Sequence, residues 1–115
     1  MVSHEELLVR LYESYNRRDL GPVLDSLSDS VFWPNTLEGG QIAGKPALED
    51  YWRRQFQVIQ VEVVPLSFEH MPDGRLVVRV NQTVSNQAGQ PWSESVVRHV
   101  FRFEESGIIA GMVLD

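Results

Sequence analysis

A histidine lies in an apolar row of a predicted strand near the end of the chain. In the stretch SVVRHVFRF, residues 95–103, alternate side chains face opposite sides of a strand, so His99 shares one face with Val97, Phe101 and Phe103. Histidine donates or accepts hydrogen bonds through two ring nitrogens and ordinarily titrates near neutral pH. The position therefore indicates either a core histidine held by hydrogen bonds or a histidine that contacts a ligand.

A second polar side chain shares the apolar row of the preceding predicted strand. Residues 75–85 alternate between apolar and polar positions, and Gln82 falls in the apolar row. The other members of this row are Leu76, Val78, Val80 and Val84. Such alternation is typical of an antiparallel strand with one buried face, so we expect Gln82 and His99 to face the same interior.

Helical spacing dominates the first half of the chain. Ser3 followed by Glu6 matches the capping-box pattern at the start of a first helix. A second helix is expected from Asp19 to near Asp29, and Pro46 suits the first turn of a third helix over residues 46–56. A short strand is expected over residues 30–33, followed by a loop over 34–44.

The second half changes to β-branched and aromatic runs separated by turn sequences. The runs cover residues 61–70, 75–85, 92–105 and 108–114, which predicts a four-strand antiparallel meander. In the first run we expect Leu66 and Phe68 to face inward, with Pro65 marking a bulge or an edge. Together the elements predict one α+β domain over residues 1–115, with helices on one face of a curved sheet.

The composition excludes several classes of function. The net charge of −6 is shared evenly between the two halves, so no basic patch is available for nucleic acid. The chain has no cysteine, which excludes disulfides and thiolate chemistry. No apolar run approaches the ~20 residues that cross a bilayer, and the acidic start differs from a signal peptide. We therefore expect a cytoplasmic protein with neither a nucleic-acid nor a membrane partner.

No cofactor or metal is predicted. The string GGQIAGK at residues 39–45 contains GxxxxGK, but Pro46 stands where a phosphate-binding loop needs serine or threonine for magnesium. The three histidines, His4, His70 and His99, have no metal-ligand spacing.

Several stretches resemble the nuclear transport factor 2-like superfamily, in its ketosteroid isomerase-like or SnoaL-like (polyketide cyclase) branch. They are LYESYNRRDLGPVLDSLSDSVFW, EGGQIAGKPALEDYW, RHVFRF and GIIAGMVLD. The resemblance implies a cystatin-like roll, in which a cone-shaped antiparallel sheet carries three N-terminal helices over its concave face and encloses an apolar pocket. It also implies a homodimer through the outer sheet face, where we expect Arg79, Asn81, Thr83, Arg98 and Arg102.

The same resemblance argues against steroid isomerisation. Ketosteroid isomerases use a carboxylate base, a first-helix tyrosine and a protonated aspartic acid. The matching positions here are Pro34, Leu11 and His99, so two of the three functional groups are absent. Tyr12 is next to the tyrosine position but is expected to point about 100° away around the helix.

Neighbouring residues offer substitutes. Glu38 as base, with His99 and Gln82 as donors, would form a chemically sensible site in which the carboxylate takes a proton and the donors stabilise charge on a carbonyl oxygen. The alternative for Glu38 is a solvated loop residue. The predicted ligand-binding residues are Trp33, Asn35, Tyr51, Gln82 and Phe101, with a purely core role as the alternative for Trp33 and Phe101.

We therefore expect a cup for a small apolar or amphipathic molecule. Its chemistry would be cofactor-independent isomerisation, dehydration or cyclisation of a carbonyl compound. The alternative is a non-catalytic binding or dimerisation module whose pocket is filled by its own side chains. A cavity lined by His99, Gln82, Tyr51 and Trp33 would favour the first, and a cup filled by Trp33 and Trp52 would favour the second.

Overall fold

The computed structural model describes residues 3–36 and 38–115. The described part contains three helices and six strands; two strands lie between the second and third helices, and four follow the third helix. The helices are α1 (His4–Asn16), α2 (Leu20–Asp25) and α3 (Lys45–Val58). The strands are β1 (Leu27–Pro34), β2 (Gln41–Ala43), β3 (Gln60–His70), β4 (Leu76–Ser85), β5 (Pro91–Phe103) and β6 (Ile109–Leu114).

The strands form one curved, open sheet in the order β2-β1-β6-β5-β4-β3. Strands β3 to β6 pair antiparallel with their neighbours in sequence, which confirms the predicted meander. Strand β1 pairs antiparallel with β2 and parallel with β6, so the sheet is not wholly antiparallel. The mixed α+β class with helices before the meander is confirmed.

The region between α2 and α3 differs from the prediction. Helix α2 ends at Asp25 rather than near Asp29, and β1 begins at Leu27. The backbone amide of Ile109 donates to the carbonyl oxygen of Ser26, and Leu27 lies opposite Ile109 in the parallel pairing. Pairing with β6 thus ends the helix early, and residues 41–43, predicted as loop, form β2 against β1.

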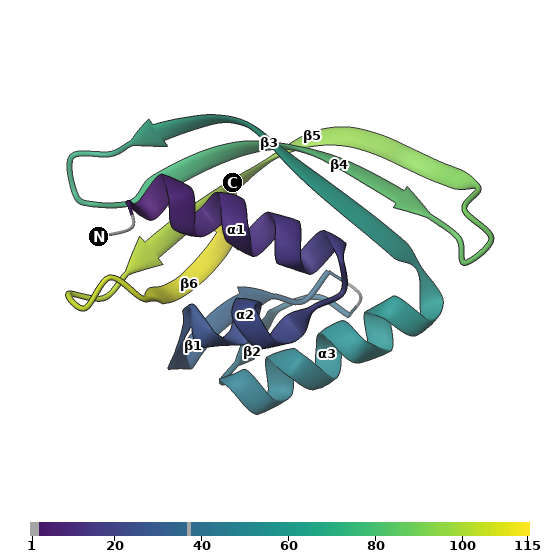
Figure 1. Cartoon of the computed structure of the whole chain (residues 1–115), viewed down its shortest axis with the longest axis horizontal. Coiled ribbons are helices and arrows are strands. Elements are labelled where there is room, and N and C mark those ends of the chain that lie inside the picture. Colours follow the sequence, from purple (N-terminus) through teal and green to yellow (C-terminus); the bar gives the residue numbers. More distant parts are fainter. Residues whose placement is uncertain (1–2, 37) are drawn as a thin grey trace.

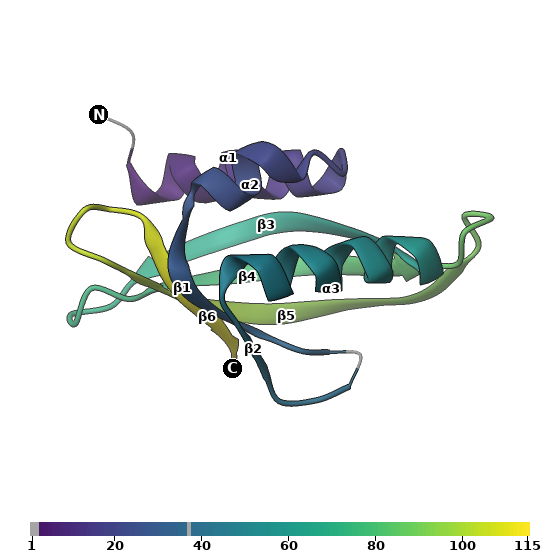
Figure 2. The same ribbon diagram turned by 90° about the horizontal axis from the view of Figure 1, so that it is seen from below.

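The helices cover one face of the sheet (Figure 1). Figure 2 shows α1 and α2 together on one side, and α3 packs against β1, β2 and β3. Each helix buries one stripe, as the apolar spacing of its sequence requires. The buried residues are Leu8, Leu11, Tyr12 and Tyr15 on α1 and Leu48, Tyr51, Trp52 and Gln55 on α3, with Ser14 also buried. These stripes and the inner sheet face form a single hydrophobic core.

Strand β3 contains a register shift between Pro65 and Ser67. Before the shift Val61 and Val63 are buried, and after it Phe68 is half-buried. Leu66 is 51% exposed, so the expectation that it faces inward is wrong. The extra residue of a bulge reverses which side chains face the core, and a strict alternation count cannot follow it.

Candidate functional site

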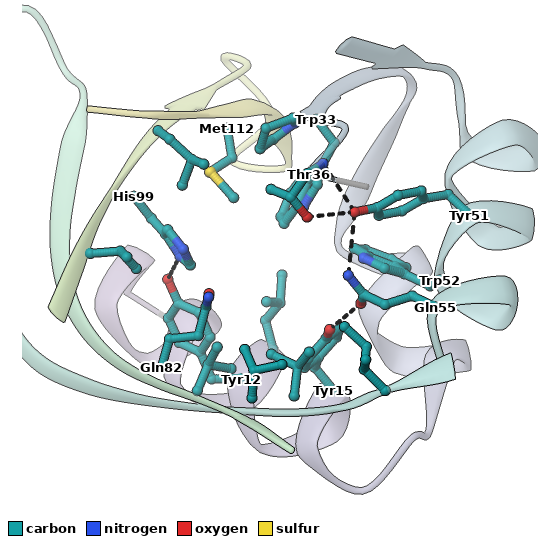
Figure 3. Close-up of a pocket in the computed structure, with 18 residues that line it drawn as sticks. Tyr12, Tyr15, Trp33, Thr36, Tyr51, Trp52, Gln55, Gln82, His99 and Met112 are labelled. Carbon is teal, nitrogen blue, oxygen red and sulfur yellow. Dashed lines mark hydrogen bonds between the residues drawn. The ribbon is translucent and has the colours of Figure 1, made fainter. Parts of the chain in front are cut away.

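A pocket of about 150 Å³ lies between the helices and the concave face of the sheet. Its walls combine aromatic and aliphatic side chains with a few polar groups (Figure 3). The lining residues are Leu11, Tyr12, Tyr15, Trp33, Pro34, Thr36, Tyr51, Trp52, Gln55, Ile59, Val61, Val63, Gln82, Val84, Val97, His99, Met112 and Leu114. A cavity of about this volume holds a molecule the size of benzene, and steroid-sized ligands need more space.

His99 and Tyr12 form a hydrogen-bonded pair on one side of this pocket. The Tyr12 hydroxyl lies 2.8 Å from His99 Nδ1, and both residues are buried. Helix α1 supplies Tyr12 and strand β5 supplies His99, so the pair bridges the helical layer and the sheet. The partner of the inward histidine is therefore a tyrosine rather than Gln82.

The second ring nitrogen of His99 contacts the cavity. His99 Nε2 has no hydrogen-bond partner among the described residues. Every fully buried side-chain nitrogen or oxygen in that part of the chain has a partner, so Nε2 is not fully buried. Figure 3 shows the His99 ring directed toward the space at the centre of the pocket. Burial lowers the pKa of His99 to about 4 and raises that of Tyr12, so both groups are neutral near pH 7.

A longer set of hydrogen bonds, the Tyr15–Gln55–Tyr51–Thr36 chain, lies across the cavity from the pair (Figure 3). Tyr15 donates to Gln55 Oε1 at 2.6 Å, and Gln55 Nε2 donates to the Tyr51 hydroxyl at 3.3 Å. The backbone amide of Thr36 also donates to this hydroxyl, at 3.2 Å, and Thr36 Oγ1 lies 2.7 Å from it. Because Tyr51 accepts twice, its own proton goes to Thr36 Oγ1, and its hydroxyl has no capacity left for a ligand.

The lining residues carry no charged side chain: none is Asp, Glu, Lys or Arg. A buried charge without a partner is costly, so such a lining favours a neutral ligand. In residues 3–36 and 38–115, no group of three or more His, Asp or Glu side chains is arranged to hold a metal ion.

Four of the seven predicted site residues line the pocket: Trp33, Tyr51, Gln82 and His99. The side chain of Gln82 is half-buried and makes no hydrogen bond within the described residues, which leaves its amide available to a ligand. Phe101 lies behind the wall: it is fully buried, and its ring contacts Trp33 and Tyr12 edge-on. It supports the lining residues rather than facing the cavity.

The other two predicted residues lie outside the pocket lining. Asn35 organises its own loop, because its Oδ1 accepts from the backbone amide of Glu38 at 2.9 Å. Glu38 is exposed, and its carboxylate lies 3.4 Å from Arg54 Nη1 on α3. A loop carboxylate paired at the surface is the alternative stated for this residue, and the arrangement gives no support to Glu38 as the base.

Sequence reasoning missed Tyr12, Tyr15 and Gln55 as site residues. The helical stripe that predicted α1 already contained both tyrosines, and the stripe of α3 placed Gln55 at its edge. A polar atom in a buried helical stripe needs a partner, and this signal could have marked all three. The expectation that Tyr12 points about 100° away from the position of Leu11 does not remove it from the site, because both residues line the cavity.

The family model for the SnoaL-like domain matches residues 8–112. This match covers nearly all of the chain, from Leu8 within α1 to Met112 within β6. The chain belongs to the SnoaL-like family of the nuclear transport factor 2-like superfamily.

Solved structures of similar fold include proteins with and without a known role. A nuclear transport factor 2-like protein of unknown function from Burkholderia pseudomallei is 25% identical, with a TM-score of 0.82 over 100% of this chain and 92% of that one. The epoxide hydrolase/cyclase-like enzyme SalBIII, of pyran ring formation in polyether salinomycin, is 15% identical, with a TM-score of 0.81 over 96% and 88%.

A third similar structure contains a bound molecule. It is a Mycobacterium tuberculosis protein in complex with estradiol-17β-hemisuccinate, 16% identical, with a TM-score of 0.80 over 94% of this chain and 88% of that one. Comparison with curated protein sequences gives no match. Among residues 3–36 and 38–115, no helix has the length and apolar character needed to cross a membrane.

Proposed function

We propose that the protein binds a small, neutral, single-ring molecule with a carbonyl or similar acceptor oxygen in the pocket. The observation that carries this proposal is the position of His99, whose Nδ1 is held by Tyr12 while Nε2 contacts a cavity of about 150 Å³. The uncharged lining favours a neutral ligand, and Trp33, Trp52 and Met112 offer the apolar surface that a ring would contact.

The chemistry that fits this site is cofactor-independent isomerisation, dehydration or cyclisation. In each of these reactions negative charge develops on an oxygen, and fixed neutral donors can stabilise it. His99 and Gln82 are lining residues that offer such a donor. No carboxylate base is among the lining residues, so proton removal would depend on the substrate's own groups.

Binding can be tested with cyclohexanone as the probe, by the rise in Tm with probe concentration and by calorimetric titration. A ligand that binds only the folded state stabilises it by RT ln(1 + L/Kd), where L is the free ligand concentration, so Tm rises with the logarithm of that concentration once it exceeds Kd. His99→Leu removes the ring nitrogens at similar volume, and we expect it to weaken the affinity about tenfold through loss of one hydrogen bond in a buried site.

The matched control is Arg98→Ala. Arg98 is adjacent on β5, is exposed, and pairs with Asp115 at 2.9 Å, so its loss should leave the affinity unchanged. Equal weakening in both variants, or no Tm rise in the wild type with cyclohexanone, would contradict the proposal.

A second candidate is a binding cup without turnover. The observation that favours it is the absence of Asp and Glu from the lining residues, because proton abstraction next to a carbonyl commonly uses a carboxylate. One measurement distinguishes a catalytic pocket from a pocket that only binds. Exchange of the α-protons of cyclohexanone with deuterated water, above the rate without protein and lost in His99→Leu, would support catalysis.

We propose further that the protein forms a homodimer through the outer face of the sheet. Register places Val64, Asn81 and Val96 side by side across β3, β4 and β5, and both valines are 50% exposed. On one side of this row lie Glu62, Thr83 and Glu94; on the other lie Ser67, Arg79 and Arg98. A twofold axis would place the acidic row of each copy against the basic row of the other.

Sedimentation of two variants tests the dimer. Val96→Arg places a charge in the centre of the row and should give a monomer. Val58→Arg changes a valine that is equally exposed, at 59%, but at the end of α3, and should leave the dimer intact. A wild type that sediments as a monomer would overturn this proposal.

A further inference from the structure

The buried Tyr12 hydroxyl restricts which nitrogen of His99 can carry the proton. Near pH 7 the imidazole is neutral and has one N–H, and the phenol has one O–H. Two arrangements fit the 2.8 Å contact with Nδ1. Tyr12 donates to Nδ1 and the imidazole proton is on Nε2, or Nδ1–H donates to the tyrosine oxygen and Nε2 is bare.

The surroundings of Tyr12 distinguish the two arrangements. Among the described residues the Tyr12 hydroxyl has one hydrogen-bond partner, His99. If Nδ1–H were the donor, the phenol proton would have no acceptor in a side chain that is 3% exposed. A buried donor without a partner is costly, whereas donation from Tyr12 to Nδ1 satisfies the phenol and leaves Nε2–H at the cavity.

We infer that Tyr12 is a positioning residue that holds His99 in the Nε2–H tautomer, and that the pocket therefore selects ligands that present an acceptor oxygen over ligands that present a donor. The inference rests on the proposed function, because it names the class of ligand for the same site. It assigns Tyr12 an indirect role, through the tautomer of His99, rather than contact with the reacting atoms.

The other polar groups of the lining do not oppose this preference, because the indole N–H groups of Trp33 and Trp52 are donors only. Across the cavity the hydroxyl of Tyr51 is saturated within the Tyr15–Gln55–Tyr51–Thr36 chain. Gln82 presents both an amide donor and an amide acceptor, so it does not discriminate between ligand classes. The direction of the Tyr12–His99 hydrogen bond therefore decides whether His99 presents a donor or an acceptor to the ligand.

The tautomer can be read directly by NMR on protein labelled with ¹⁵N-histidine. A protonated ring nitrogen and a bare one have widely separated ¹⁵N shifts, and the His99→Leu spectrum identifies the His99 signals among those of His4 and His70. We expect a protonated Nε2 and a bare Nδ1 in the wild type. A protonated Nδ1 would overturn the inference without affecting the proposal that the pocket binds a small molecule.

Two probes test the ligand class. Cyclohexanone is an acceptor only, and phenol is a strong donor of similar size, so the ratio of their Kd values reports the preference. In Tyr12→Phe the constraint on the tautomer is removed, and we expect the preference for cyclohexanone to fall about fivefold, the effect of one net hydrogen bond. An unchanged ratio would contradict the role of Tyr12.

Tyr15→Phe is the matched control. It removes a phenol that also lines the pocket from the same helix, one turn from Tyr12, but that is bonded to Gln55 instead of His99. Because the Tyr12 hydroxyl is retained, the His99 nitrogen shifts should remain those of the wild type. If neither probe binds any of these proteins, the ligand preference and the proposed function both fail, while the NMR shifts still decide the tautomer.

Discussion

The two sets of hydrogen bonds in the pocket differ in whether they are complete. In the Tyr15–Gln55–Tyr51–Thr36 chain, the Tyr51 hydroxyl accepts two hydrogen bonds and donates one, all within the protein. In the Tyr12–His99 pair, one ring nitrogen is bonded and the other contacts the cavity. Buried polar groups of similar type therefore serve two purposes in one pocket: the chain connects α1, α3 and the loop after β1, and the pair presents a group to a ligand.

This difference separates stability from binding. A complete set of hydrogen bonds, as in the Tyr15–Gln55–Tyr51–Thr36 chain, stabilises the folded state and leaves few polar groups free to bind a ligand. A group with one unused position in a buried site costs stability until a ligand occupies it, and this is typical of functional sites. Changes in the chain should therefore mainly alter the free energy of unfolding, and changes in the pair should mainly alter the affinity for a ligand.

The largest expected effect on stability comes from breaking the chain at its centre. Gln55→Leu keeps the approximate volume but leaves the buried hydroxyl of Tyr15 without its acceptor and that of Tyr51 without one donor. We expect the free energy of unfolding, measured by urea denaturation, to fall by roughly 3–4 kcal/mol. Gln57→Leu on the exposed side of the same helix should change it by less than ~0.5 kcal/mol; a loss of similar size there would contradict this prediction.

The burial of neutral His99 should make the free energy of unfolding depend on pH in the acid range. Burial lowers the pKa of His99 to about 4 from the ordinary 6.5, so the unfolded chain takes up this proton first as the pH falls. Between these values the unfolded state binds more protons, and the free energy of unfolding should decrease with falling pH, by about 3 kcal/mol from this residue. Urea denaturation of the wild type and His99→Leu from pH 7 to 4 isolates this contribution from that of the carboxyl groups; parallel curves would contradict it.

A smaller change in stability is expected when the pair is broken from the tyrosine side. Tyr12→Phe retains the ring that packs edge-on against Phe101 but removes the hydroxyl bonded to His99 Nδ1. We expect the free energy of unfolding to fall by about 1 kcal/mol, the net value of one hydrogen bond. A loss as large as that in Gln55→Leu would mean that the pair and the chain do not differ in their contribution to folding.

The smallest effect is expected outside both sets. Glu38→Gln removes one charge of a surface pair with Arg54, and exposed pairs contribute between about 0 and 1 kcal/mol. We expect the affinity for cyclohexanone to stay within twofold of the wild type. A tenfold loss in calorimetric titration would instead show that Glu38 reaches the pocket when a ligand is bound.

Local patterns in the sequence predicted the fold well. Capping at Ser3, the apolar stripes of the helices and the alternation in the meander each depend on a few neighbouring residues. The errors came from pairings between distant segments. The contact of Ser26 and Leu27 with Ile109 shortens α2, and the shift after Pro65 turns Leu66 outward.

The candidate site was predicted less completely for a related reason. His99 and Gln82 could be placed because strand alternation assigns a face to each residue, and Tyr51 because it borders an apolar stripe. Adjacent positions on a helix differ by only about 100°, so the packing angle of α1 on the sheet decides whether Leu11, Tyr12 or both face the cavity. That angle is set by the whole core, and loop residues such as Glu38 have no periodicity from which a direction could be inferred.

The uncharged lining of the pocket has a consequence for the speed of binding. A neutral ligand that approaches a cavity without charged walls is not accelerated by long-range attraction, even though the chain carries a net charge of −6. Its association rate should therefore be nearly independent of ionic strength, as should its equilibrium affinity. The lifetime of the complex, rather than the rate of encounter, would then distinguish one ligand from another.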